Sequence, residues 1–182
     1  MGLDSVEIVV EVENCFGIEI QDEDAANMRT VQHMVDYVWD RIEHKDAKAC
    51  LTQILFFRLR KFFCENLNIK PALFTPTGHF TEIGNKKQFD ALWAKLEEEL
   101  KLDIPNIYTG ERILLVFKVQ SDTVQDLIES IIYTNIKELG DEYSITKSTV
   151  FSVVASITHS IVGAPRKDIV PSAEFVKDLG VS

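Results

Sequence analysis

Ser5 is the first residue whose type and surroundings suggest chemistry, because it follows Asp4 at the start of an apolar-periodic segment. A serine hydroxyl acts as a nucleophile when a base and oxyanion donors accompany it. No G-x-S-x-G, GxGxxG or P-loop string occurs in the chain. The histidines are scattered and suggest no base for a serine: His33, His44, His79 and His159. The sequence therefore predicts that the chain is not an enzyme.

Cysteine and histidine spacing also argues against metal and disulfide chemistry. Cys15, Cys50 and Cys64 are odd in number and have no CxxC spacing, which is typical of reduced thiols in a cytoplasmic protein. The histidines have no zinc-ligand spacing. The sequence predicts a cytoplasmic protein without a metal site.

Composition describes an acidic chain that can bury a core. Hydrophobic residues make up 46% and charged residues 26%, and the formal net charge is −10. A polyanion repels phosphate backbones and anionic lipid headgroups, so we expect basic protein surfaces as partners rather than nucleic acid or membranes. The N-terminus is too acidic for a signal peptide, and the apolar stretch 113–117 is too short to span a bilayer.

Three pairs of similar segments form an internal repeat. Residues 30–38 and 123–131 both begin with a Thr suited to cap a helix, followed by apolar residues at helical spacing. In the second pair, an amphipathic helix runs into a short extended stretch. In the third pair, a long apolar helix ends at Asn or Gly, and a buried apolar residue, Pro and Phe follow. The last two pairs are 12–20 with 96–104, and 68–80 with 163–175.

The order of these segments predicts two domains. Residues 45–140 contain one complete set of helices, whereas residues 1–44 have only the later helices and residues 141–182 only the first. Short amphipathic helices are marginal without tertiary packing, so we expect the two ends to combine into a circularly permuted unit. In this unit the helix 148–162 should pack against Ile8, Val12, Phe16, Met34 and Val38. A dimer that exchanges tails between two chains satisfies the same burial. Residues 112–120 interrupt the repeat with β-branched and aromatic residues, which favours a short strand.

Residues 1–44 and 141–182 resemble the two halves of an acyl carrier protein. Leu3 to Ile20, with Asp22-Glu23-Asp24-Ala25 and Thr30-Val31, is similar to the family's recognition helix, FGIEIPDE-type turn and later helices. Asp168 to Val181 is similar to the FVEDLG-type segment that precedes the carrier serine. Residues 45–140, the middle unit, are a more diverged copy. The resemblance implies an all-α fold of two acyl-carrier-like four-helix bundles.

Carriers of this family hold 4'-phosphopantetheine on a serine at the start of the recognition helix, added by a phosphopantetheinyl transferase. Asp4-Ser5 matches the family's Asp-Ser motif, which makes Ser5 the candidate attachment site. Counting back from Phe16 without gaps against the family pattern instead puts Gly2 on the carrier position and Ser5 three residues later. The register from Phe175 puts Ser182 on the motif's Asp. In the middle unit, Lys86 occupies the carrier position.

Glu7 and Glu11 lie one turn apart and share a helix face. The resemblance implies that this face docks with basic patches on enzymes of fatty-acid or polyketide-type acyl metabolism. The alternative is a scaffold or regulatory protein that keeps the carrier fold without phosphopantetheine.

Overall fold

The computed structural model describes residues 2–43, 50–105 and 123–182. Within these ranges the regular structure is helical, which confirms the predicted all-α class, and the segment 112–120 lies outside them. The α-helices are α1 Leu3–Phe16, α2 Asp22–Asn27, α3 Val31–Trp39, α4 Leu51–Leu67, α5 Phe80–Ile83, α6 Lys86–Leu100, α7 Val124–Thr134, α8 Ile136–Glu142 and α9 Lys147–Val162. Two short 3-10 helices are η1 Pro71–Leu73 and η2 Arg166–Asp168.

The chain divides into two compact units. Unit 1 consists of Met1–Lys48 with Ile136–Ser182, and unit 2 of Ala49–Asn135. The sequence pattern suggested a boundary after residue 140, which falls inside α8. The structure places α8 in unit 1, where it packs on α1 and buries Ile136 and Leu139.

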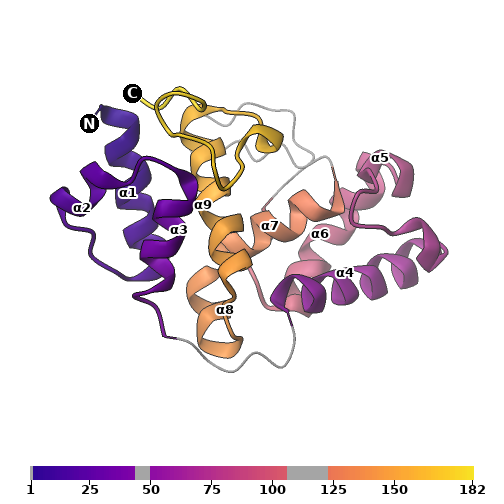
Figure 1. Ribbon diagram of the computed structural model, residues 1–182. Helices are drawn as coiled ribbons and strands as arrows, with labels where there is room; N and C mark the ends of the chain where they lie inside the picture. Colours follow the sequence, from indigo (N-terminus) through magenta and orange to yellow (C-terminus); the bar gives the residue numbers. More distant parts are fainter. Residues whose placement is uncertain (1, 44–49, 106–122) are drawn as a thin grey trace. The chain divides into compact units, whose positions relative to one another are not determined.

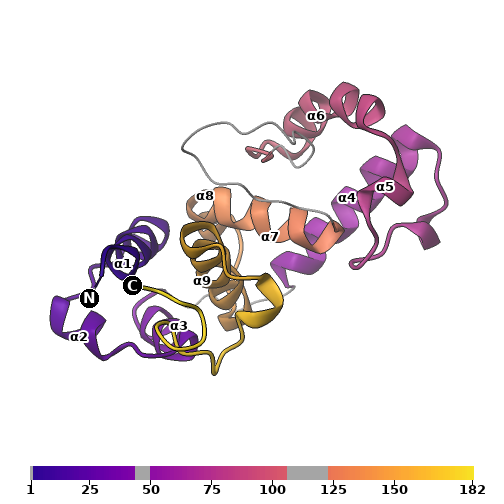
Figure 2. The ribbon, with the colours of Figure 1, turned by 90° about the horizontal axis from the view of Figure 1, so that it is seen from above.

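Unit 1 is built around α9, which packs on α1 and on α3 of the same chain (Figures 1 and 2). The predicted contact surface is buried on α3, at Met34 and Val38. On α1, Ile8 and Val12 are buried as expected, but the third buried residue is Cys15 and Phe16 is only half-buried. Seven residues on a helix turn through nearly two full turns, so Cys15 lies about 20° from Ile8 while Phe16 lies about 80° away.

The first and last described residues of unit 1 lie side by side (Figure 1). The Ser5 backbone N–H donates to the Ser182 carbonyl oxygen at 3.3 Å, and the Ser182 N–H donates to Asp4 Oδ2 at 3.1 Å. An ion pair of 2.6 Å between Lys147 Nζ and Asp36 Oδ1 joins the start of α9 to α3. Both segments predicted to be incomplete alone are therefore covered by each other.

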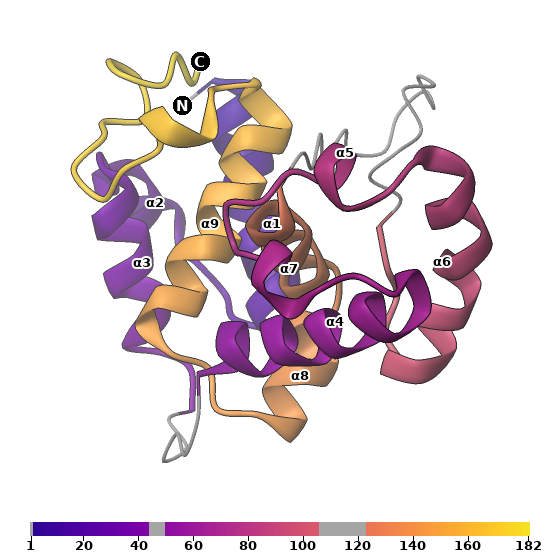
Figure 3. The same cartoon turned by 90° about the vertical axis from the view of Figure 1, so that its right-hand side faces the viewer.

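Unit 2 repeats this arrangement with a continuous segment of chain, and α4 packs on α6 and α7 (Figure 3). Its core is an aromatic cluster centred on Phe63, whose ring centroid lies 5.6 to 5.9 Å from those of Phe74, Phe80 and Phe89. Aromatic pairs at such separations add to the stability that burial provides. All four rings are nearly inaccessible to solvent.

The loop that follows α9 in unit 1 and the loop that follows α4 in unit 2 make the same hydrogen bonds. In unit 1 the Gln32 N–H donates to the Pro171 carbonyl, and in unit 2 the Gln125 N–H donates to the Pro76 carbonyl, at 2.8 and 2.9 Å. The residue pairs are those that the sequence repeat aligns. Thr30 and Thr123 also cap α3 and α7, because each side chain accepts the N–H three residues later, and at α7 the Asp126 side chain completes a capping box.

Candidate carrier and docking site

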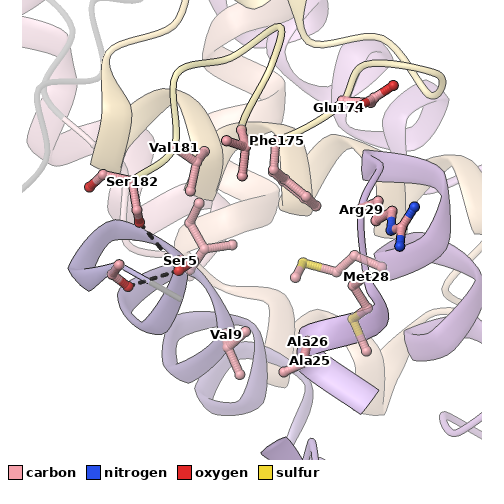
Figure 4. A pocket seen from close by; sticks show the side chains of 14 residues that line it. Ser5, Val9, Ala25, Ala26, Met28, Arg29, Glu174, Phe175, Val181 and Ser182 are labelled. Atoms are coloured by element: carbon pink, nitrogen blue, oxygen red, sulfur yellow. Dashed lines mark hydrogen bonds between the residues drawn. The ribbon is translucent and has the colours of Figure 1, made fainter. Parts of the chain in front are cut away.

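Ser5 lies in the first turn of α1, three residues after the N-cap Gly2. Its hydroxyl is half-buried and donates to the Gly2 carbonyl at 2.8 Å, with the Ser182 carbonyl oxygen at 3.3 Å (Figure 4). The candidate hydroxyl therefore has backbone acceptors within unit 1. Modification at this oxygen requires that these two hydrogen bonds break.

Asp4 is held by the opposite end of the chain. The Ser182 hydroxyl donates to Asp4 Oδ2 at 2.6 Å, and the Ser182 backbone N–H donates to the same oxygen. These donors favour the carboxylate and hold the pKa of Asp4 below its ordinary value. Ser182 is exposed to solvent, so this is a surface interaction.

The carrier position that the register assigns to Gly2 has no room for a side chain. A Cβ atom at Gly2 would collide with the Ser182 backbone. The corresponding end of α6 carries no hydroxyl either: Asn85 forms a capping box with Gln88, and Lys86 pairs with Asp90 at 3.6 Å. The carrier position predicted from the sequence is thus occupied by a glycine in unit 1 and by a lysine in unit 2.

A pocket of about 400 Å³ opens beside Ser5 in unit 1 (Figure 4). Pockets that hold small ligands lie in this size range and are mostly apolar. Met28, Phe175 and Val181 contribute apolar surface, and Arg29 contributes a cation. Ser5 and Arg29 line the pocket from opposite sides (Figure 4). Sequence reasoning missed this pocket, because α1, the residues after α2 and the last turns of the chain meet only in the folded unit.

The predicted docking residues both lie on α1. Glu7 is exposed, and Glu11 is half-buried beside Cys15, whose thiol donates to Glu11 Oε1 at 3.9 Å. Val6 and Val10 are also exposed on this helix, at 42% and 46%. The face therefore combines an apolar ridge with carboxylates along one side.

The cysteine in the unit 1 core is poorly suited to react as a thiolate. Burial, reinforced by the Glu11 carboxylate, raises the pKa of Cys15 to about 12. In the described ranges, no group of three or more His, Cys, Asp or Glu side chains is placed to hold a metal ion. No helix in those ranges is long and apolar enough to cross a membrane.

Comparison with known proteins relates part of the chain to acyl carrier proteins. A stretch of 46 residues is 49% identical to the acyl carrier protein of Rubrobacter xylanophilus, covering 25% of this chain and 53% of that protein. A stretch of 37 residues is 50% identical to the acyl carrier protein of Chlorobium phaeobacteroides, covering 20% of this chain and 47% of the relative. No protein-family model and no solved structure matches the chain.

The chain spans about half the length of the curated relatives it matches. The predicted resemblance is confirmed for an acyl-carrier-like region, and these relatives are carriers by name rather than enzymes, in agreement with the prediction that the chain is not an enzyme. Ser5, Asp4, Glu7 and Glu11 remain predicted functional residues.

Proposed function

We propose that the chain is an acyl-carrier-like protein that docks through α1 with enzymes of fatty-acid or polyketide-type acyl metabolism. The observation that carries the proposal is the exposed face of α1, where the ridge formed by Val6 and Val10 has Glu7 beside it and Glu11 one turn further on. Such a face complements a basic patch with an apolar centre. A cytoplasmic location, inferred from the cysteine pattern, is part of the same proposal.

The unequal distribution of charge supports α1 as the docking helix. Unit 1 contains 18 acidic and nine basic residues, whereas unit 2 contains 11 and ten. The positions on α6 that the repeat aligns with Glu7 and Glu11 are Ala91 and Lys95. A basic enzyme surface is attracted to the first helix and not to the second.

As a carrier, the protein would hold 4'-phosphopantetheine on Ser5, and the group's terminal thiol supplies the thioester linkage to an acyl chain. The pocket beside Ser5 supports this attachment site, since a pocket of this size can shelter part of the arm. The chain's own contribution is to orient the Ser5 oxygen in the first turn of α1.

A second candidate function is a scaffold or regulatory protein that docks with the same enzymes without the arm. The hydrogen bonds of the Ser5 hydroxyl to backbone carbonyls favour this form, as does the glycine at the carrier position. The circularly permuted arrangement would then have preserved the docking helix and filled the modification site with the Ser182 segment.

Intact mass after incubation with a phosphopantetheinyl transferase and coenzyme A separates the two forms. A carrier gains the mass of one phosphopantetheine group, and Ser5→Ala abolishes the gain while Ser182→Ala retains it. No gain in the unmodified chain contradicts the carrier form and leaves the scaffold.

Docking has its own test. We expect Glu7→Lys with Glu11→Lys to slow association with an acyl-carrier-dependent synthase by about tenfold at low salt, because steering by opposite charges is lost. Reversing Glu97 and Glu98 on α6, which are also exposed, is the matched control. An unchanged association rate in the α1 variant would place the docking surface elsewhere.

A further inference from the structure

Helix α4 of unit 2 presents an apolar and basic face that the carrier resemblance does not account for. Phe57 is 46% exposed, and Arg60 and Lys61 follow it by about one turn, on either side of the same face. Glu65 is the single acidic residue of α4, against three basic ones. Large exposed aromatic side chains next to arginine are typical of protein interaction surfaces.

The basic residues of α4 have different roles. Arg58 points to the end of α6, where its Nη2 donates to the carbonyl oxygens of Glu99 and Leu100 at 3.4 and 3.3 Å. Arg60 instead lies over the rings of Phe56 and Phe57, at 5.5 and 4.7 Å from their centroids. Stacking of this kind holds the guanidinium at the surface beside exposed aromatic carbon.

Another part of the same chain has the complementary character. Along α1, Leu3, Val6 and Val10 are exposed at 72%, 42% and 46% and form a ridge at helical spacing. The Glu7 carboxylate lies beside this ridge, and unit 1 as a whole is strongly acidic while unit 2 is nearly balanced. An aromatic ridge between two cations thus matches an aliphatic ridge beside an anion.

We propose that the Phe57–Lys61 face of α4 binds α1 of a second copy of this chain. In a two-fold dimer this contact would be made twice, α1 to α4 and α4 to α1. The second copy is the occupant because its ridge and its charge are both complementary.

This inference does not rest on the proposed docking with acyl enzymes. In the dimer, Val6, Glu7 and Val10 are covered by the partner. Self-association would therefore compete with any other protein that uses the same face of α1.

Reciprocal charge reversal tests the pairing. Sedimentation velocity of the full chain over a range of concentrations should show a monomer–dimer equilibrium that weakens with added salt. We expect Glu7→Lys and Lys61→Glu each to raise the dimer dissociation constant by about tenfold, because each places like charges together in both contacts. The combined variant restores opposite charges and should recover most of the lost affinity.

Two further variants complete the experiment. Phe57→Ala should also weaken the dimer, since it removes the apolar centre of the contact, whereas Glu98→Lys on the exposed surface of α6 should leave it unchanged. Near-ultraviolet circular dichroism verifies that each variant is folded. A chain that stays monomeric at all concentrations overturns the proposal. So does a dimer that is insensitive to Lys61→Glu, or one that the combined variant fails to restore.

Discussion

The two units share one pattern, a long helix packed on two others, but the chain supplies these helices in a different order in each. In unit 1, α9 from the C-terminal part of the chain covers α1 and α3 from the N-terminal part, whereas in unit 2 the segment from α4 to α7 is continuous along the chain. The loop hydrogen bonds are nevertheless equivalent, and both units use a threonine N-cap. Helix pairing in these units depends on which apolar faces meet and not on the order in which the chain supplies them.

The two units differ most at the start of α1 in unit 1 and the start of its counterpart α6 in unit 2. Unit 2 stabilises α6 with a complete capping box between Asn85 and Gln88. Unit 1 begins α1 at Gly2 without a side-chain cap, and backbone and side-chain atoms of Ser182 serve the first turn instead. The end of α1 that bears Ser5 therefore depends on tertiary contact, while the end of α6 is stabilised locally.

The largest effect should come from removing the part of unit 1 that is distant in sequence. Deleting residues 140–182 removes α9, so residues 2–43 should lose protection from amide hydrogen exchange while residues 50–105 keep theirs. The reason is that α1 and α3 lose the helix on which both of their buried faces pack.

Single substitutions at equivalent positions provide the control for this deletion. Val154 of α9 and Leu59 of α4 are both fully buried and are aligned by the repeat. Val154→Asp should unfold unit 1 alone and Leu59→Asp unit 2 alone, because each buries an unpaired carboxylate. Loss of protection in both units from either substitution would show that the units do not fold independently.

An intermediate effect is expected where the two helices end. Gly17 after α1 and Lys101 after α6 occupy equivalent left-handed positions, with φ of 64° and 57°. A side chain at such a φ is strained, so Lys101→Gly should stabilise unit 2 by about 0.5–1 kcal/mol, and Gly17→Ala should destabilise unit 1 by about 1 kcal/mol. Hydrogen exchange of each unit in mild denaturant measures both changes. The two changes in the free energy of unfolding should have opposite signs, and destabilisation of unit 2 by Lys101→Gly would contradict this expectation.

The smallest effect concerns the contact between Asp4 and Ser182. The pKa of Asp4 is lower in the folded chain than in the unfolded one, so the stabilisation is complete above the ordinary carboxyl pKa and is lost as the pH falls through the lowered value. The amide resonance of Ser182 should report this titration in nuclear magnetic resonance spectra. Asp4→Asn should abolish it, and a titration that survives in this variant would assign it to another group.

Much of the local structure could be predicted from the sequence. Thr30 and Thr123 are N-caps, Phe74 and Ile169 are buried, and Gly163 and Asn68 end the two long helices in the left-handed conformation, as the repeat indicated. These features depend on short-range chemistry, namely side-chain caps, glycine or asparagine at helix ends, and apolar periodicity.

Other features depended on contacts that the pattern does not encode. Cys15 rather than Phe16 completes the buried face of α1, because the helix ends at Gly17 and the exact angular position decides burial. The placement of α8 on α1 was also missed, since its short amphipathic segment continues directly from α7 and matches no part of the repeat.

The sequence by itself determined the helices, their caps, the repeated loop and the resemblance to acyl carrier proteins, because each is a local property of residue type and spacing. Only the tertiary structure decided what surrounds Ser5. The Ser182 carbonyl, the crowded Gly2 position and the apolar pocket come from segments more than 130 residues apart in the sequence, which meet because burying α9 between α1 and α3 brings the two ends of the chain together.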